Sequence, residues 1–250
     1  MVMPLYDDNS DRHSFPVVNV TLIVINILVF VLLQGMGNNL DFTYAYSTVP
    51  AEITSGKDLV TEGRIIAGMQ GGQRVEMEVP GLQPTPIPVY LTLITSMFMH
   101  GGLMHIAGNM WFLWIFGDNI EDDMGKLRYV VFYLLCGIVA SLAHVFTDIN
   151  SQIPSLGASG AISGVMGAYL VLHAYRRVTV LMLRVIMDVP AWVAVGLWFA
   201  FQVVSGYVNK GDGVAYAAHI GGFVAGAALA YPFMLGRRKP ARYERLTRGI

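Results

Sequence analysis

The chain has 250 residues, of which 54% are hydrophobic and only 13% are charged, and its formal net charge is −1. This composition argues against a water-soluble domain and indicates a membrane protein, and the near-zero charge argues against a nucleic-acid partner. The single cysteine, Cys136, excludes an internal disulfide and lies in an apolar run typical of a buried side chain.

Six apolar segments meet the length of a membrane span, which needs roughly 20 predominantly apolar residues. They are residues 17–33, 103–117, 129–146, 159–175, 189–208 and 214–235. The first is predicted to be a retained helix and not a signal peptide, because three aspartates and no small-residue cleavage site precede it. The sequence therefore predicts an all-α integral membrane protein, a six-helix bundle forming a single domain over residues 1–250.

Basic residues occupy alternate loops, which predicts the orientation through the positive-inside rule. They gather in two short loops and the C-terminal tail, at Lys126, Arg128, Arg176, Arg177, Arg184 and residues 237–250. This side is predicted to be cytoplasmic, with residues 1–16 as a cytoplasmic N-terminal tail and residues 237–250 as a basic cytoplasmic tail. Residues 34–88, rich in Gly and Pro, are predicted to form a long extracytoplasmic loop between the first two helices.

Polar groups at membrane depth are costly and therefore mark function. No Asp or Glu lies within the six predicted spans, which argues against proton relays, carboxylate-based transporters and aspartyl proteases. No His-Glu-x-x-His motif is present for a zinc hydrolase. The polar groups that remain are His105, Asn109, Ser159 and His219, each within a few turns of the outer end of the predicted second, fourth or sixth helix. All four are therefore expected at similar depth.

Ser159 lies in Gly157-Ala-Ser-Gly160, where a loop becomes a helix and the hydroxyl is free of the helix's own bonding. A serine at this position is usually only a cap. However, Gly160, Gly164 and Ala168 form one small-residue stripe, and Gly222 and Gly226 form another after His219. Such stripes let helix backbones approach closely in lipid, which would bring the hydroxyl and the imidazole into hydrogen-bond reach. The alternative is tight packing with a lone histidine bonded to a carbonyl.

Four motifs of this chain resemble those of the rhomboid family of intramembrane serine proteases. They are Gly157-Ala-Ser-Gly160, Ala218-His219-Ile-Gly-Gly222, the segment from His100 to Asn109 with His105 inside it, and the Gly117-x-x-x-Glu121-x-x-x-Gly125 pattern. The resemblance covers about residues 17–236, and the motifs follow the family's order and spacing.

The resemblance implies a six-helix bundle around a water-filled cavity open to the outer face. It implies Ser159 as nucleophile, His219 as general base, and His105 and Asn109 as oxyanion donors together with the Ser159 backbone N–H. It further implies transmembrane protein substrates within the lipid bilayer and no metal or cofactor. With no carboxylate in the spans, His219 would act as one half of a dyad. This chain departs from some members at Ser163, where they carry a Tyr that stacks on the catalytic His, and at residues 91–92, where they carry Trp-Arg.

Two other functions remain open. An inactive rhomboid-like membrane chaperone or trafficking protein would be favoured if Ser159 or His219 were replaced, and both are present. A channel or transporter would need polar groups along a through-path, whereas these groups stop in the outer half. The location expected is a prokaryotic cell (inner) membrane, with both termini cytoplasmic.

Overall fold

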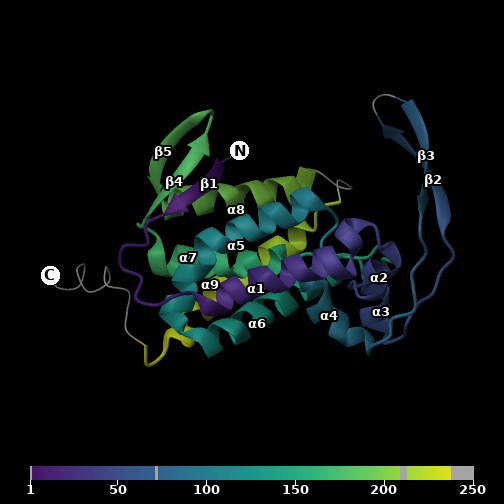
Figure 1. Ribbon diagram of the computed structural model, residues 1–250, viewed down its shortest axis with the longest axis horizontal. Coiled ribbons are helices and arrows are strands. Elements are labelled where there is room, and N and C mark those ends of the chain that lie inside the picture. Colours follow the sequence, from purple (N-terminus) through teal and green to yellow (C-terminus); the bar gives the residue numbers. More distant parts are fainter. Residues whose placement is uncertain (1, 71–72, 209–212, 238–250) are drawn as a thin grey trace.

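The computed structural model describes residues 2–70, 73–208 and 213–237, and most of them are helical. Figure 1 shows the longer helices running side by side, with strands at both ends of the bundle. These helices are α1 (Val17–Leu28, continued by a π-helical turn at Val29–Leu33), α5 (Leu103–Met124), α6 (Lys126–Val145), α7 (Ser159–His173), α8 (Ala191–Val208) and α9 (Tyr216–Met234). Each of the six predicted segments therefore contains a helix.

Among the described residues, three helices are long and apolar enough to cross a membrane on their own: α6, α8 and α9. A fourth crossing is possible where the helical segment 89–98 and α5 meet at an 81° bend. The α1 segment and α7 are shorter apolar helices. The count of six crossings therefore stays a prediction.

The second helix is longer than predicted. We expected its end at Gly117, where the charged residues begin, but α5 continues for two more turns to Met124. The extra turns are stabilised because their polar side chains find partners in the N-terminal segment. Arg12 Nη1 donates to Asp118 Oδ2 at 2.6 Å, and the backbone N–H of Ser14 donates to Asp122 Oδ1 at 2.9 Å.

The Gly117-x-x-x-Glu121-x-x-x-Gly125 motif joins α1, α5 and α6. Glu121 accepts the backbone N–H groups of Val18 and Asn19 at 3.0 and 2.7 Å, so it caps the start of α1 from the neighbouring helix. A Cβ at Gly117 would lie 2.0 Å from Asn19 Oδ1. Gly125 has φ +79° in the turn between α5 and α6, a conformation that favours glycine. The motif therefore has a structural role.

The fold is mostly helical, as predicted, but it is not all-α, because five strands are present among the described residues. β1 (Val2–Asp7), β4 (Arg177–Met182) and β5 (Val185–Pro190) form an antiparallel sheet in the order β1-β4-β5. The register pairs Val2 with Met182 and Asp7 with Val178. β4 contains three consecutive β-branched residues, Val178, Thr179 and Val180, which favour a strand. Residues 2–7 of the predicted N-terminal tail and the basic loop before α8 are thus joined in one sheet.

The long insertion between the first two predicted spans is partly folded and not a uniform loop. It contains a 3₁₀ turn (Gly35–Gly37), α2 (Leu40–Ala45), α3 (Pro50–Ser55) and the hairpin of β2 (Arg64–Gln70) and β3 (Gln73–Val79). A 3₁₀ turn (Val89–Leu91), α4 (Thr92–Thr95) and a further 3₁₀ turn (Ser96–Phe98) then lead into α5. Figure 1 places α2, α3 and this hairpin at the end of the bundle opposite the three-stranded sheet.

Basic side chains gather at the sheet end of the bundle. Arg128 Nη1 donates to the carbonyls of Phe233 and Leu235 at 3.0 and 2.7 Å, and Arg176 donates to the carbonyl of Asp8 at 2.9 Å. Arg237 donates to the carbonyls of Asp122 and Asp123 in the last turn of α5. The basic residues that were predicted to lie on one side of the membrane are therefore found at the same end of the bundle. The rest of the predicted basic tail, residues 238–250, lies outside the described residues.

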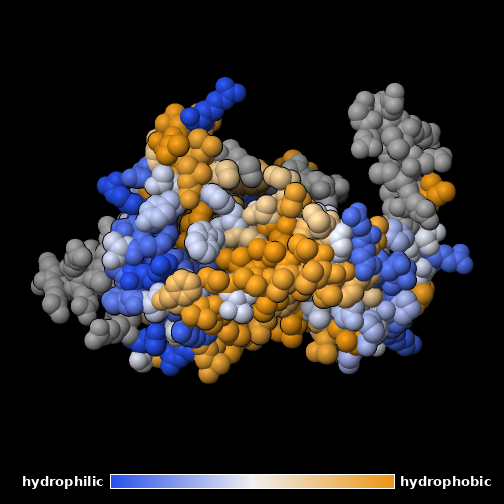
Figure 2. All heavy atoms as spheres, viewed as in Figure 1, coloured by the Kyte–Doolittle hydropathy of each residue, from blue (hydrophilic) through white to orange (hydrophobic). Residues whose placement is uncertain are grey.

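Apolar side chains cover the middle of the bundle both inside and outside. Tyr129, Phe132, Tyr133 and Tyr169 are fully buried between the helices. Figure 2 shows hydrophobic residues gathered over the middle of one face and hydrophilic residues near both ends. Large apolar side chains such as Leu32 and Trp114 are exposed. This distribution is typical of a membrane protein, whose outer surface meets lipid.

Candidate active site

Ser159 and His219 are in direct contact. Ser159 is the first residue of α7 and His219 lies in the first turn of α9, 60 residues further along the chain. The distance from His219 Nε2 to Ser159 Oγ is 2.8 Å, and both side chains are half-buried. The predicted hydrogen-bond contact between the hydroxyl and the imidazole is therefore present.

This contact depends on a very close approach of α7 and α9. A Cβ on Gly222 would lie 2.0 Å from the carbonyl oxygen of Gly160, and one on Gly226 would lie 1.9 Å from that of Gly164. Neither distance is possible for a real side chain, so only glycine lets the backbones touch. The predicted packing of the two small-residue stripes is confirmed.

The turn before α7 fixes the position of Ser159. Gly157 has φ +126°, and its N–H donates to the carbonyl of Ser96 at 2.9 Å. The first N–H groups of a helix have no partner inside the helix, so this turn leaves the backbone N–H of Ser159 near its hydroxyl. A Cβ on Gly157 would lie 2.9 Å from Nε2 of His105, which shows that this imidazole packs against the turn.

His105 and Asn109 lie one turn apart on α5. His105 is exposed, and its Nδ1 accepts the N–H of Gly101 at 3.3 Å. Asn109 is buried, and its Nδ2 has no hydrogen-bond partner among the described residues. Among the same residues no hydrogen bond joins Asn109 to Ser159 or His219. The structure thus brings His105 to the Ser159 turn and leaves a buried amide donor free on the same helix.

Gln202 is a site residue that the sequence analysis missed. It lies on α8, is only 6% exposed, and places Oε1 at 2.8 Å from Nδ1 of His219. The predicted site residues lie in the second, fourth and sixth helices, whereas Gln202 is a neutral amide in the fifth. The signal was present, because Gln202 is a long polar side chain inside the apolar run of α8.

Two aromatic rings also lie near His219. The ring centroids of Trp198 and Tyr216 lie 6.1 and 6.4 Å from that of His219. Ser163 makes no ring contact, and its Oγ instead donates to the carbonyl of Ser159 at 2.6 Å. Because Ser163 supplies no stacking ring, the His219 imidazole is instead contacted by Gln202 and Trp198 of α8.

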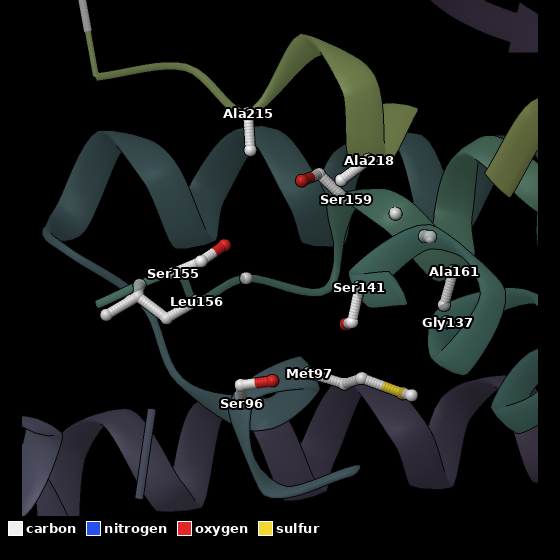
Figure 3. Close-up of a pocket in the computed structure, with 13 residues that line it drawn as sticks. Ser96, Met97, Gly137, Ser141, Ser155, Leu156, Ser159, Ala161, Ala215 and Ala218 are labelled. Carbon is white, nitrogen blue, oxygen red and sulfur yellow. The ribbon is translucent and has the colours of Figure 1, made fainter. Parts of the chain in front are cut away.

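A pocket opens beside Ser159. Figure 3 shows Ser159 at its edge, below the first turn of α9, with Ser96 and Met97 on the opposite side. Most of its lining is small, and it includes Gly137, Ala140, Ser141, Gly157, Gly160 and Ala215. These small walls leave room beside the Ser159 hydroxyl for a small side chain.

The fold is that of an integral membrane protein, because its helices are apolar and much of its surface is compatible with lipid. Its candidate site is a Ser–His pair at one end of the bundle. Residues 88–236 match the family model of the rhomboid domain, which is more than half of the chain. The chain belongs to the rhomboid family.

Relatives of known name include both proteases and rhomboid-like proteins. The chain is 37% identical over 141 residues to Rhomboid protease GluP of Bacillus subtilis (strain 168), covering 56% of this chain and 26% of that protein. It is 29% identical over 148 residues to RHOMBOID-like protein 5 of Arabidopsis thaliana, covering 57% of this chain and 44% of that protein. It is 30% identical over 156 residues to Rhomboid protein 1, mitochondrial, of Saccharomyces cerevisiae, covering 60% of this chain and 44% of that protein.

The chain thus spans less than half the length of these three relatives. They come from a bacterium, a plant and a yeast, and the yeast protein is named as mitochondrial, so the prokaryotic cell membrane stays a prediction.

Proposed function

We propose that this chain is an intramembrane serine endopeptidase that cleaves transmembrane segments of other membrane proteins with Ser159 and His219. The observation that carries the proposal is the 2.8 Å contact between Ser159 Oγ and His219 Nε2, in a family that includes named proteases. A hydroxyl in this contact can lose its proton to the imidazole as it attacks a carbonyl carbon.

The reaction proceeds in two halves. In the first, His219 Nε2 takes the Ser159 proton while Oγ bonds to the scissile carbonyl carbon, and the imidazolium then protonates the leaving amine as the C–N bond breaks. In the second, water attacks the resulting ester of Ser159 and gives one proton to Nε2. That proton returns to Ser159 Oγ when the C–O bond to the enzyme breaks, which releases a carboxylic acid.

Asn109, His105 and the backbone N–H of Ser159 are the proposed donors to the oxyanion. The free, buried Nδ2 of Asn109 supports this role, because a buried donor without a partner is costly unless a ligand or transition state uses it. The same role for His105 is supported by the packing of its imidazole against Gly157, two residues before Ser159. These donors act on charge that develops only in the transition state.

The proposed substrate is a transmembrane helix that enters from the bilayer and unwinds so that one peptide bond becomes extended. The pocket of small residues beside Ser159 supports a small side chain next to the cleaved bond. Water enters from the end of the bundle that carries α2 and α3, which is the predicted outer face.

An inactive rhomboid-like chaperone or trafficking protein is the alternative function. The test is to treat the purified protein in detergent with a fluorescent fluorophosphonate, and to assay cleavage of a model transmembrane substrate. Wild-type protein should be labelled and should cleave, and Ser159→Ala should do neither while melting at the same temperature. Folded wild-type protein that neither reacts nor cleaves any of a panel of transmembrane substrates would favour the alternative.

A further inference from the structure

Gln202 completes a chain of three side chains from three helices. Its Oε1 on α8 is 2.8 Å from Nδ1 of His219 on α9, and the other ring nitrogen is 2.8 Å from Ser159 Oγ on α7. We propose that Gln202 is a positioning residue that fixes the tautomer and the plane of the His219 ring. This inference rests on the proposed function of the Ser159–His219 pair.

The tautomer follows from the chemistry of the two contacts. A carbonyl oxygen only accepts hydrogen bonds, so Nδ1 must carry the ring proton that points to Gln202 Oε1. The other nitrogen, Nε2, then holds a lone pair directed at the hydroxyl of Ser159. This is the protonation state that a general base needs, whereas the opposite tautomer would donate to Ser159 and could not accept its proton.

Gln202 is also well placed to hold the ring still. It is buried on α8, so its amide is shielded from water that would compete for Nδ1. The titratable groups that act on His219 from α5 and α6 are themselves imidazoles, of His105 and His144. The amide oxygen is therefore a fixed acceptor for a ring that has no anionic partner among the residues that the structure describes, and its dipole stabilises the imidazolium formed during the reaction.

Three variants test this role, each compared with wild-type protein for the rate of fluorophosphonate labelling and for kcat. Gln202→Met keeps the length of the side chain and removes the acceptor, so turnover should fall about tenfold with KM unchanged. Gln202→Glu restores an acceptor, should recover most of the rate, and should move the acidic limb of the pH–rate profile to higher pH, because a carboxylate favours the imidazolium. Ser205→Ala, a buried polar change one turn further on α8, is the control and should leave all of these unchanged.

A direct readout separates this inference from the proposed function. The ¹⁵N chemical shifts of the His219 ring report which nitrogen is protonated, whether or not the protein cleaves anything. A ring protonated at Nδ1 in wild-type protein, with a mixture of tautomers in Gln202→Met, supports the inference even if no substrate is found. A ring protonated at Nε2 in wild-type protein overturns it. Equal rates and equal pH profiles for wild type, Gln202→Met and Gln202→Glu, in protein that does cleave, would overturn it as well.

A second surface stands independently of the active site, at the other end of the bundle. The hairpin of β4 and β5 has one entirely apolar face, because the register pairs Val178 with Val189, Val180 with Met187 and Met182 with Val185. Val178 and Val180 are buried against the helices, but Val185 and Met187 are exposed. Figure 1 shows these strands crossing the direction of the helices and projecting past α8. The apolar face therefore extends beyond the edge of the helix bundle. Its exposed part faces in the same direction as its buried part, toward the level of the helices.

We infer that this overhanging face rests on the bilayer, with the acyl chains of the nearest phospholipids as its partner. The surface is continuous with exposed apolar residues of α8, which begins directly after β5 and presents Trp192, Leu197 and Phe201. The two-residue turn carries Leu183 with φ +51° and Arg184 with φ +69°, and Leu183 is 84% exposed. The turn thus presents an apolar tip beside a guanidinium that can reach lipid phosphates.

Neighbouring residues on opposite faces of β5 give a matched test. Val185→Cys and Ile186→Cys are each labelled with an environment-sensitive fluorophore, which is selective because Cys136, the chain's single native cysteine, is buried. In proteoliposomes, the label at residue 185 should be quenched at least several-fold more by nitroxide placed on lipid acyl chains than the label at residue 186. Equal quenching at the two positions, or none at either, would overturn the inference.

Discussion

Replacing Gly226 by alanine puts a methyl group into the closest contact between α7 and α9. The new Cβ would lie 1.9 Å from the carbonyl oxygen of Gly164 and 2.5 Å from its Cα. Carbon atoms in contact prefer a separation of about 3.5 to 4.0 Å, so the two helices must move apart by roughly 1.5 Å. No side-chain rotation can relieve this, because the atoms that collide belong to the backbone.

The same two helices carry Ser159 and His219, so the displacement acts on their 2.8 Å contact. Overpacking of this kind costs about 1 to 3 kcal/mol of stability, and a misplacement of about 1 Å at a reacting centre can lower the rate about 100-fold. We therefore expect Gly226→Ala to melt at a lower temperature and to lose about two orders of magnitude in turnover per folded molecule.

The assay combines thermal melting in detergent with fluorophosphonate labelling normalised to folded protein. Gly196→Ala on α8 is the control, because a Cβ there meets nothing within 4 Å and alanine favours helix. It should melt no lower than wild type and react at the same rate. If Gly226→Ala kept both the wild-type rate and the wild-type melting temperature, close packing of α7 on α9 would not be what holds the pair together.

Three further predictions concern single side chains. Asn109→Ala should lower turnover on the order of 10²–10³-fold in kinetic assays while Ser159→Ala abolishes it; an unchanged rate with a lowered melting temperature would make Asn109 only a packing residue. Glu121→Ala leaves the buried N–H groups at the start of α1 unpaired, so it should cost about 3 kcal/mol in denaturation measurements, and Glu121→Gln should cost less. Burial raises the pKa of Asp7 from 3.8 to about 7, against a hydrogen bond from Tyr169 that lowers it. The folded state therefore binds this proton more tightly than the unfolded chain, and the stability present below about pH 4 is lost as the pH rises through about 7. The melting temperature should fall over that range in wild type and stay flatter in Asp7→Asn.

The helices and the Ser159–His219 contact were predictable because both depend on local patterns. Apolar runs mark the helices, and the glycine stripes on two of them imply a close approach whatever the rest of the fold does. The sheet was not predictable in the same way. β1 is six residues long, contains Pro4, and pairs with a strand more than 170 residues later in the chain. Nothing local indicates such a partner.

The other two misses have different physical causes. α5 runs past Gly117 because a helix ends where its backbone loses partners, and not where the apolar residues stop; Arg12 and the backbone of Ser14 supply partners for the charged turns. Gln202 was missed because the predicted site residues came from the second, fourth and sixth helices, and the polar side chain within the apolar fifth helix was not connected to them. Only the folded structure shows that α8 lies close enough to α9 for this amide to reach His219.

The pairing of β1 with β4 also constrains how the protein is made. Val2 is synthesised long before its partner Met182, which follows α1, α5, α6 and α7 in the chain. At translation rates of 5–20 residues per second, the first strand waits roughly ten seconds or more for its partner. During that time Asp7 and the edge of β1 are without the groups that bury them, and the segment is exposed to chaperones and proteases. The three-stranded sheet can therefore close only late in biogenesis, after the long helices α1, α5, α6 and α7 have been synthesised.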